Sequence, residues 1–354
     1  MLSETKPLLS IRNLKTYFVM DEGTAQAVDG VSFDVHEGQV VGVVGESGCG
    51  KSVTIKSVLR IVQKPGRIVD GEILWRRPSS NGQDEIIDLA QLDAQGKQMR
   101  SIRGGEIALI PQEPMASFSP VHTVGNQLIE AIRLHTNVNK REAKQIAIES
   151  LHEVGMPSPE QCLDAYSWQL SGGLRQRAMI AMALSCNPRL LIADEPTTAI
   201  DVTTQAQVLN LLRRLQQELS MSIIFITHDL GVIAQIADYV AVMYLGRIVE
   251  TGPVDNIFHN PQHPYTIALL KSIPTIHQVS KEFLPTIEGS IPHPFNRPAG
   301  CPYYPRCSAF MLGTCDRRTP RLLPVNRLQS AGCFLHHDAA EENGQANGST
   351  KSES

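Results

Sequence analysis

A glycine-rich segment that ends in lysine and serine is the clearest chemical signal in this sequence of 354 residues. It reads Gly45-Glu46-Ser47-Gly48-Cys49-Gly50-Lys51-Ser52 and directly follows the apolar run Val40–Val44. Glycines at this spacing let successive backbone N–H groups face phosphate oxygens, and the start of a following helix adds positive potential. We therefore expect Lys51 to reach the β- and γ-phosphates of a nucleotide and the Ser52 hydroxyl to ligate Mg²⁺. A plain glycine turn is the alternative, but the apolar run before the loop and a helix predicted at 52–63 argue against it. Cys49 is expected to be a small filler residue of the loop.

Two adjacent carboxylates follow a second apolar run. Leu190–Ala193 is followed by Asp194 and Glu195, and then by Pro-Thr-Thr. If this strand ends beside the phosphate loop, Asp194 can hold Mg²⁺ and Glu195 can act as the general base that polarises an attacking water. A salt-bridged strand end is the alternative without chemistry. Together with the loop, the two acids predict a nucleoside triphosphatase.

A third motif narrows the class of triphosphatase. Residues 170–177 read Leu-Ser-Gly-Gly-Leu-Arg-Gln-Arg and resemble the signature motif of the ATP-binding-cassette (ABC) ATPases. The resemblance covers about residues 9–258. It implies a head-to-tail dimer in which Ser171, Gly172 and Gly173 begin a helix that faces the γ-phosphate of a nucleotide bound to the opposite subunit. Leu174 stands where many members have Gln, and Ile200 stands where Leu is usual.

The same resemblance implies roles for three further polar residues. Gln112 would sense Mg²⁺ and the attacking water, His228 would hold the γ-phosphate, and Asp201, in Ala199-Ile200-Asp201, would belong to the D-loop. The expected catalytic residues are Glu195, His228, Lys51 and Gln112, and the expected Mg²⁺ ligands are Ser52, Gln112 and Asp194. The expected nucleotide-binding residues are Gly45, Ser47, Gly48, Cys49, Gly50, Lys51, Ser52, Val53, Gln112, Ser171, Gly172, Gly173, Asp194, Asp201 and His228.

An aromatic residue early in the chain is expected to stack on adenine, as the resemblance implies. Tyr17 and Phe18 are the two candidates, and the distance from Asn13 favours Phe18. A core aromatic without contact to nucleotide is the alternative for either residue.

The elements that must position these residues follow an α/β pattern. Short continuous apolar runs such as Val40–Val44 and Ile223–Ile226 predict strands buried on both faces of a parallel sheet. Runs with more alternation predict antiparallel strands at Val31–Val35, Gly71–Trp75 and Val240–Val249, and Arg76–Glu85 reads as a surface loop. Asn139 and Glu142 form a capping box that predicts a helix to Val154. The expected fold class is α/β, a P-loop NTPase ABC cassette with a RecA-like core, an antiparallel β subdomain and a helical signature subdomain.

The last part of the chain has a different composition. Prolines are dense there, and Cys301, Cys307, Cys315 and Cys333 occur close together. His263-Pro264-Tyr265-Thr266 and the box Gly300-Cys301-Pro302 to Pro305-Arg306-Cys307 resemble the ATPases of oligopeptide and dipeptide permeases, in particular the D-type subunit. We expect an ABC ATPase domain at 1–260, a small irregular cysteine-rich domain at 261–337 and a disordered tail at 338–354.

Four thiolates suffice for a [4Fe–4S] cluster or a zinc site. The resemblance to the peptide-permease ATPases implies an iron–sulfur cluster. Zinc ribbons usually use C-x₂-C knuckles, which the chain does not have, so zinc is the second interpretation, and unligated cysteines are the remaining alternative. A clamp that holds a segment of low periodicity together is the expected role, and redox sensing is a second possibility.

Composition limits the remaining function classes. The net charge of −4 argues against a protein that coats nucleic acid, and the sequence has no apolar run long enough to span a membrane and no signal peptide. We expect a peripheral protein on the cytoplasmic face of the cell membrane that hydrolyses ATP to power import of di- or oligopeptides. Its expected partners are an F-type ATPase, two integral-membrane permeases and, indirectly, an extracytoplasmic binding protein. The alternatives are an importer of nickel or another small solute and a soluble ABC ATPase outside transport.

Overall fold

The structure is a computed structural model and describes residues 6–78, 83–113, 117–198, 201–273, 287–293 and 295–337. Two features of the sequence lie outside the described residues: the tail 338–354, and Ala199-Ile200 of the expected D-loop. Among the described residues, no helix combines the length and the apolar character that crossing a bilayer requires.

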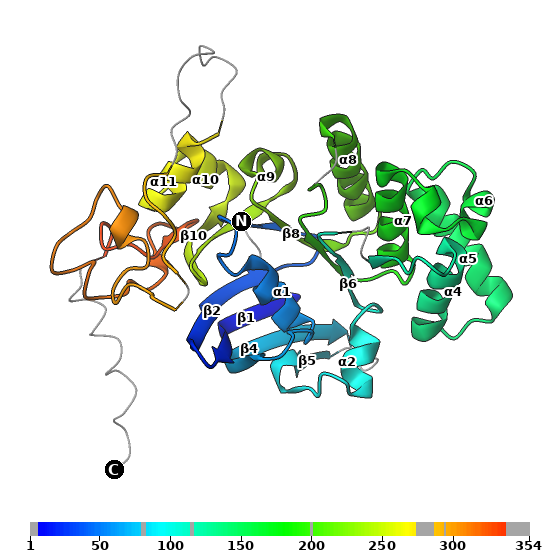
Figure 1. The fold of residues 1–354 in the computed structure, drawn as a ribbon, viewed down its shortest axis with the longest axis horizontal. Coiled ribbons are helices and arrows are strands. Elements are labelled where there is room, and N and C mark those ends of the chain that lie inside the picture. The colour runs from blue at the N-terminus through cyan, green and yellow to red at the C-terminus, as the bar shows by residue number, and fades with distance from the viewer. Residues whose placement is uncertain are drawn as a thin grey trace.

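The described strands form two sheets (Figure 1). The smaller sheet is antiparallel, in the order β2-β1-β4-β5, with β1 at Leu9–Met20, β2 at Gly23–Val35, β4 at Gly66–Pro78 and β5 at Asp84–Asp88. The larger sheet has the order β11-β12-β10-β9-β3-β8-β7-β6. In that order its strands span Leu323–Pro324, Ser330–Ala331, Arg247–Pro253, Tyr239–Tyr244, Val40–Val44, Ser222–Thr227, Leu190–Asp194 and Ile107–Ile110. Strands β9, β3, β8, β7 and β6 run parallel, so their carboxyl ends lie along one edge of the sheet.

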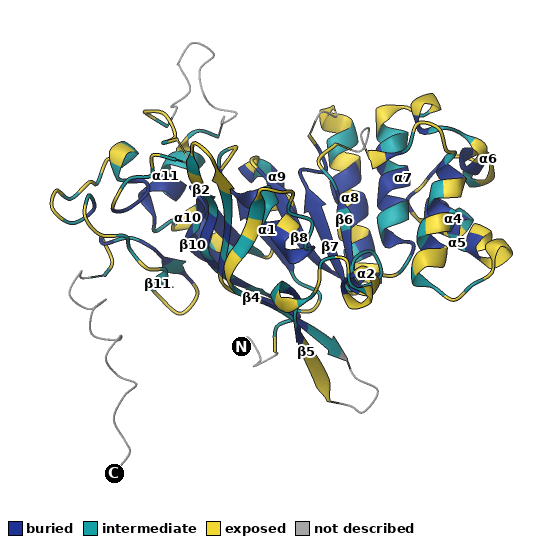
Figure 2. Ribbon diagram, turned by 60° about the horizontal axis from the view of Figure 1, so that its bottom comes forward, coloured by how far each residue is buried: buried dark blue, intermediate teal, exposed yellow. Residues whose placement is uncertain are grey.

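The central strands are apolar along their length because both of their faces are covered. Every residue of β3, β7 and β8 is buried (Figure 2). Successive side chains of a strand point to opposite faces. Val41 and Val43 accordingly pack in the cluster formed with the four-stranded sheet and the helix that follows the glycine loop, whereas Val40 and Val44 pack in the cluster formed with the other helices.

The described helices carry the remaining regular structure. In chain order, the α-helices are α1 (Lys51–Val58), α2 (Lys97–Ile102), α4 (Val124–His135), α5 (Lys140–Glu153), α6 (Pro159–Asp164), α7 (Gly172–Leu184), α8 (Val202–Glu218), α9 (Leu230–Ile236), α10 (Val254–His259) and α11 (Pro264–Lys271). Short 3₁₀ turns occur at Leu89–Gln91, Ser167–Gln169 and Tyr304–Arg306. Helices α4 to α7 form a group at one end of the molecule, on the far side of α8 from α1 (Figures 1 and 2).

The capping box of α5 is confirmed. The Asn139 side chain accepts hydrogen bonds from the backbone N–H groups of Arg141 and Glu142, and the Glu142 carboxylate accepts from the N–H of Asn139. Helix α1 ends at Val58, earlier than the predicted residue 63.

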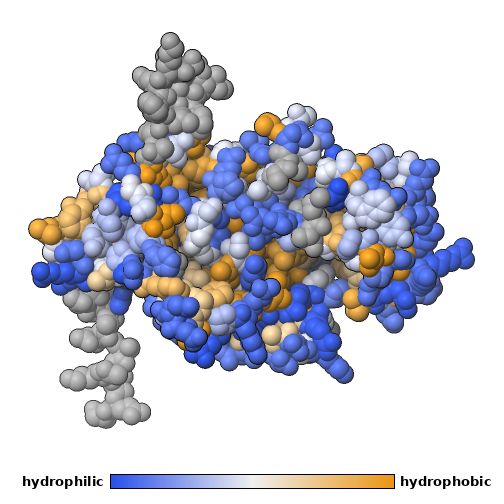
Figure 3. Space-filling view, in the orientation of Figure 1, coloured by the Kyte–Doolittle hydropathy of each residue, from blue (hydrophilic) through white to orange (hydrophobic). Residues whose placement is uncertain are grey.

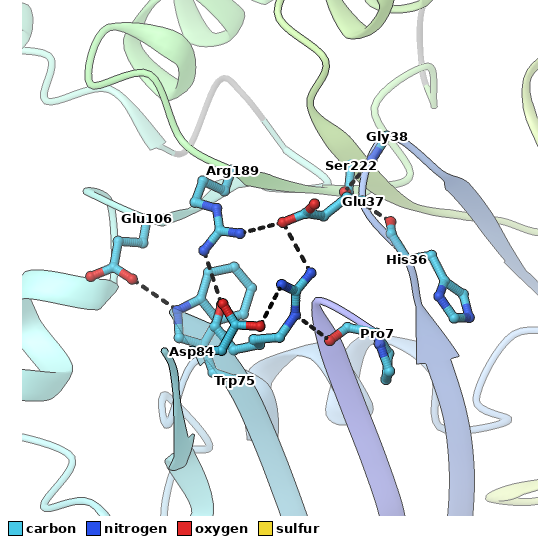
Figure 4. A network of polar contacts seen from close by, with 10 residues as sticks. Pro7, His36, Glu37, Gly38, Trp75, Asp84, Glu106, Arg189 and Ser222 are labelled. Carbon is cyan, nitrogen blue, oxygen red and sulfur yellow. Dashed lines mark hydrogen bonds and ion pairs between the residues drawn. The ribbon is translucent and has the colours of Figure 1, made fainter. Parts of the chain in front are cut away.

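A polar network fastens the four-stranded sheet to the larger one (Figure 4). Arg76 of β4 pairs with Glu37 at 3.0 Å and with Asp84 at 3.1 Å. Arg189, directly before β7, pairs with the same Glu37 at 2.6 Å and lies 5.7 Å from the ring centroid of the buried Trp75. The network lies at the amino ends of β3 and β7, away from their carboxyl edge, and so holds the two sheets together without occupying that edge.

Two of the predicted elements were wrong in their bounds. Val240–Val249 is not one antiparallel strand, because β9 lies parallel to β3 and then turns into the antiparallel β10. Arg76–Glu85 is not simply a surface loop, since its ends lie in the paired strands β4 and β5. For Val240–Val249, the apolar sequence alone does not mark where one strand ends or which neighbour each half pairs with. For Arg76–Glu85, the polar composition hid the pairing of its two ends, Arg76–Pro78 with Asp84–Ile86.

The prediction of a separate cysteine-rich C-terminal domain is not supported. Strand β12 pairs with β10, which makes the end of the chain part of the larger sheet. Tyr265, Tyr303 and Phe334 belong to the same apolar cluster as the helices of the cassette. The C-terminal segment is defined as residues 261–337; its described residues therefore pack on the cassette and share its core. In the view of Figure 3, hydrophobic residues gather toward the middle of the surface and hydrophilic residues cover most of the helical end.

Candidate active site

The glycine loop joins the carboxyl end of β3 to α1, as the sequence predicts. Gly45 and Gly50 have positive φ angles of 155° and 106°. A Cβ atom would lie 2.2 Å from the Met243 carbonyl oxygen at the first position and 2.3 Å from that of Ala27 at the second, so neither position can carry a side chain. These close approaches fix the loop against β9 and β2, in the tight glycine turn that a phosphate-binding loop requires.

Lys51 lies inside this loop. Its side-chain nitrogen donates to the carbonyl oxygens of Gly45 at 2.7 Å and Glu46 at 3.2 Å, and the residue is only 5% exposed. The ammonium group is thus held inside the loop, as expected of a lysine that reaches the β- and γ-phosphates of a bound nucleotide. Cys49 is buried beside it, and burial raises the pKa of its thiol, which agrees with a filler role.

The expected Mg²⁺ ligands Ser52 and Asp194 lie together. The Ser52 hydroxyl, at the start of α1, donates to the Asp194 carboxylate at the end of β7 over 3.1 Å. Burial raises the pKa of Asp194 above its ordinary value, against the effect of that hydrogen bond. A hydroxyl and a carboxylate are oxygen ligands of the kind that Mg²⁺ prefers. The pair therefore fits the group that the sequence predicts.

Glu195 is the centre of the second half of the site. Its Oε2 accepts from Gln112 Nε2 at 3.1 Å and from the Thr198 hydroxyl at 3.0 Å, and its Oε1 lies 3.3 Å from His228 Nδ1. Gln112 follows β6 and His228 follows β8, so the carboxyl ends of neighbouring parallel strands bring these side chains together.

Glu195 is also conformationally unusual. Its φ angle is 47°, in the left-handed region, and its N–H donates to the Ile226 carbonyl of the adjacent strand at 2.9 Å. A glutamate in this region costs about 1–3 kcal/mol, and such residues cluster at functional sites. The side chain of Glu195 is 10% exposed and that of His228 is 54% exposed. The Glu195 carboxylate is fixed by Gln112 and Thr198 and lies beside a solvent-exposed histidine. This arrangement is suited to position a water molecule.

The signature residues lie elsewhere on the surface. Ser171 caps α7 by accepting from the Leu174 N–H at 3.4 Å, and Ser171 and Gly172 are exposed. Asp201 caps α8 through the N–H and the hydroxyl of Thr204, and these hydrogen bonds lower the pKa of its exposed carboxyl. Figures 1 and 2 show α7 on the far side of α8 from α1, the helix that follows the glycine loop, so these residues lie away from the loop of their own chain.

The two aromatic candidates point to opposite faces of β1. The Tyr17 hydroxyl donates to Asp29 at 2.8 Å, and burial together with this bond raises the pKa of Tyr17 to about 12. Phe18 lies over Gly66, where a Cβ would come within 2.6 Å of its ring. Thr16, on the same face as Phe18, shares a hydrogen bond of 2.8 Å with Ser57 of α1. Phe18 thus faces the helix that begins at the glycine loop.

The four C-terminal cysteines line one small cavity together with Tyr303 and Phe334. All four are free thiols, and burial raises the pKa of Cys301 to about 12 and of Cys333 to about 11. Within the part of the chain that the structure describes, no three His, Cys, Asp or Glu side chains are grouped closely enough to hold a metal ion. The thiols therefore share a cavity but do not form a preassembled metal site in this conformation.

Comparison with known proteins decides the family. Residues 28–198 match the ABC transporter family, and residues 249–315 match the C-terminal region of the oligopeptide/dipeptide transporter family. The chain is 47% identical to the oligopeptide transport ATP-binding protein AppD of Bacillus subtilis, over 95% of this chain and 98% of the relative. It is 45% identical to the dipeptide transport ATP-binding protein DppD of Escherichia coli, over 94% of this chain and 98% of the relative.

The chain belongs to the ABC transporter ATP-binding proteins. This ABC protein also resembles solved cassettes. A dimeric ATP-binding cassette bound to ADP and Pi covers 70% of this chain and 98% of its own length, with a TM-score of 0.59 and 24% identity. A cassette from Clostridium perfringens covers 72% of this chain and 91% of its own, with a TM-score of 0.58 and 25% identity. The cassette fold is thereby confirmed.

Three contacts at the site were missed by the sequence analysis. Thr198 donates to Glu195, and the Pro-Thr-Thr that follows the two acids was the signal that could have found it. Arg306 pairs with Glu46 of the glycine loop, and the Tyr265 hydroxyl accepts from the Glu46 N–H. No local pattern joins residues so far apart in the chain.

Proposed function

We propose that this ABC protein is the ATP-hydrolysing subunit that powers import of di- or oligopeptides. One observation carries the ATPase part. The glycine loop with Lys51, the Ser52–Asp194 pair and the Glu195 carboxylate converge at the carboxyl ends of adjacent parallel strands. The peptide cargo is supported by the names of relatives that span nearly the whole chain, including the dipeptide transport ATP-binding protein of Bacillus subtilis at 45% identity.

In the proposed reaction, water attacks the γ-phosphate in line with the leaving oxygen. Lys51 neutralises phosphate charge. Ser52 and Asp194, with Gln112 nearby, would hold Mg²⁺, which when bound offsets the charge on the phosphate oxygens. Glu195 orients and deprotonates the water, and His228 contacts the γ-phosphate. We assign adenine stacking to Phe18, because Tyr17 is engaged with Asp29.

The site needs a second subunit. Ser171, Gly172 and Gly173 start α7 at the surface, where helix N–H groups could bind the γ-phosphate on a partner. The exposed Asp201 caps α8 through Thr204, whose methyl group lies against Gly173. We propose that this partner is a related F-type ATPase and that the chain is the D-type subunit. The pair would sit beneath two integral-membrane permeases, on the cytoplasmic face of the membrane, and receive cargo from an extracytoplasmic binding protein.

Within this proposal, residues 1–260 hydrolyse ATP and residues 261–337 form the permease-type appendage. The four cysteines would hold a [4Fe–4S] cluster, with zinc as the alternative. All four line one cavity, which supports them as the ligands. To bind a metal, the thiols would have to move closer to one another than they are in this structure. Protein purified without oxygen should contain iron and absorb in the visible range, and Cys307→Ser should remove both. Zinc without iron would establish the other metal.

Co-purification from the native membrane tests the function. We expect two integral-membrane permeases and a sister ATPase to accompany the chain, and uptake of a labelled dipeptide to require it. Uptake of nickel instead of peptide would support the alternative cargo. Recovery with ribosomes or DNA and without permeases would support a soluble ABC ATPase. The short interval 113–170 between Gln112 and the signature argues against the long coiled-coil insertion of DNA-repair types.

A further inference from the structure

The side chain of Glu46, second residue of the glycine loop, is held by the C-terminal segment. Arg306 makes two parallel contacts with its carboxylate, from Nη1 to Oε2 at 2.8 Å and from Nη2 to Oε1 at 3.1 Å. The Arg306 side chain is 3% exposed and the Glu46 side chain is 23% exposed. A bidentate guanidinium–carboxylate pair fixes orientation as well as distance.

The backbone of Glu46 is held at the same time. Its N–H donates to the hydroxyl of the fully buried Tyr265 at 2.9 Å, and its carbonyl oxygen accepts from Lys51 at 3.2 Å. The N–H, the carbonyl and the carboxylate of one loop residue are therefore all engaged. Two of these three partners come from the C-terminal segment, and the third is the phosphate-binding lysine.

The holders of Glu46 are themselves held. Arg306 Nε donates to the Glu288 carbonyl at 3.0 Å, and its guanidinium lies 5.9 Å from the ring centroid of Tyr244. Tyr244, Tyr265 and Tyr303 pack together with centroid distances of 4.7 to 5.3 Å. Because Arg306 and the three tyrosines pack against one another, a displacement of the C-terminal segment would also displace Glu46 and the phosphate loop.

We propose that Arg306 and Tyr265 are positioning residues for the phosphate loop, so that the C-terminal segment sets the nucleotide affinity of this chain. The two residues fix Glu46, and through it the backbone that leads into the N–H groups of residues 47–50. A preorganised loop binds phosphate without first paying the entropy of ordering. This inference rests on nucleotide binding at the loop and not on the identity of the cargo.

The test measures nucleotide affinity and thermal stability on the same full-length variants, using a fluorescent ATP analogue. Arg306→Ala removes two charge-assisted contacts and should weaken binding by roughly 10-fold or more, while Arg306→Lys should restore part of the affinity. Tyr265→Phe removes only the hydroxyl acceptor and should weaken binding by roughly 2- to 10-fold. Arg327→Ala is the matched control, because Arg327 is an exposed arginine of the same C-terminal segment. It lines a pocket with His36 and Asp238, which precede β3 and β9, whereas the phosphate loop follows the carboxyl end of β3.

A double-mutant cycle separates positioning from general stability. If Arg306 acts through Glu46, then Arg306→Ala combined with Glu46→Gln should weaken binding no more than the stronger single change. A purely structural role would lower the melting temperature and leave the affinity of the folded protein unchanged, which would overturn the inference. Additive losses would overturn it as well. Failure of the unaltered chain to bind the analogue would instead count against the proposed function.

Discussion

Replacement of Glu195 by glutamine separates the chemistry of this residue from its structural contacts. The amide oxygen of glutamine can take the place of Oε2 and keep both the Gln112 bond of 3.1 Å and the Thr198 bond of 3.0 Å. The amide nitrogen then lies where Oε1 faces His228, and it can donate to a neutral imidazole nitrogen. The change therefore preserves the shape and the hydrogen bonds of the site but removes the proton acceptor.

The expected loss of rate follows from the role of a general base. Such a base contributes about 100- to 10,000-fold, or about 3–5 kcal/mol of activation free energy. We expect kcat for ATP hydrolysis to fall by that factor in Glu195→Gln, with ATP affinity kept and the closed, ATP-bound dimer accumulating. The free energy of unfolding should change by less than about 1 kcal/mol, because both hydrogen bonds have replacements.

Glu195→Ala is the matched variant for the structural contribution. It removes the acceptor of both bonds and should lower the free energy of unfolding by about 1–3 kcal/mol in addition to the loss of rate. Steady-state phosphate release, binding of a fluorescent ATP analogue and urea denaturation distinguish the two effects. A Glu195→Gln protein that turns over within a few-fold of the unaltered chain would refute the assignment of the base. Equal losses of affinity and of kcat would show that the residue acts in binding.

Three further predictions follow from other contacts. Lys51→Ala should weaken nucleotide binding by roughly 10- to 100-fold, because a charged partner of the phosphates is lost. Titration with the fluorescent analogue measures this affinity, and an unchanged value would contradict the assignment of the phosphate loop. Glu250→Ala should lower the free energy of unfolding by about 2–6 kcal/mol in urea, because the N–H groups of Gln262 and His263 lose their buried acceptor, and Glu250→Gln should cost less. Burial alone would raise the pKa of Asp29, but its contacts with Arg247, Tyr17 and Arg297 hold that pKa below the ordinary value of 3.8. These contacts therefore stabilise the folded protein fully above pH 3.8, and the stabilisation is lost as the pH falls through the lowered pKa. Asp29→Asn should remove that acid dependence in pH-resolved thermal melts, and an unchanged profile would contradict it.

The parallel core and the half of the site that it carries could be predicted from sequence because their signals are local. Val40–Val44 is apolar at every position, and such a run before a glycine loop has few structural solutions. Asp194 and Glu195 follow Leu190–Ala193, and parallel strands end at the same edge of a sheet, so the sequence predicts that these two acids lie near the glycine loop. The Ser52–Asp194 bond is the result.

The C-terminal segment could not be placed in the same way. Its sequence has little periodicity and few ways to build a core, so the cysteines suggested a clamp that holds the segment together. In the structure its partners are supplied by the cassette: Thr251 pairs with Ser330 across the sheet, and Arg297 reaches Asp29 of β2 at 2.5 Å. To predict this packing, one must know which apolar surfaces of the cassette would be exposed without the C-terminal segment. A single sequence does not show those surfaces.

This placement gives the C-terminal segment a physical route to the chemistry of the cassette. Buried Glu250 of β10 accepts from the N–H of His263, and His263 in turn caps α11 by accepting from the N–H of Tyr265 at 3.0 Å. Tyr265 then receives the N–H of Glu46 in the glycine loop. All three hydrogen bonds are 2.9 to 3.0 Å long, and the first two are buried, so the start of α11 cannot shift without disturbing either the sheet or the loop. If a permease or a bound metal changes the C-terminal segment, we expect the change to be felt first in nucleotide affinity rather than at Glu195, because the series ends at the phosphate loop.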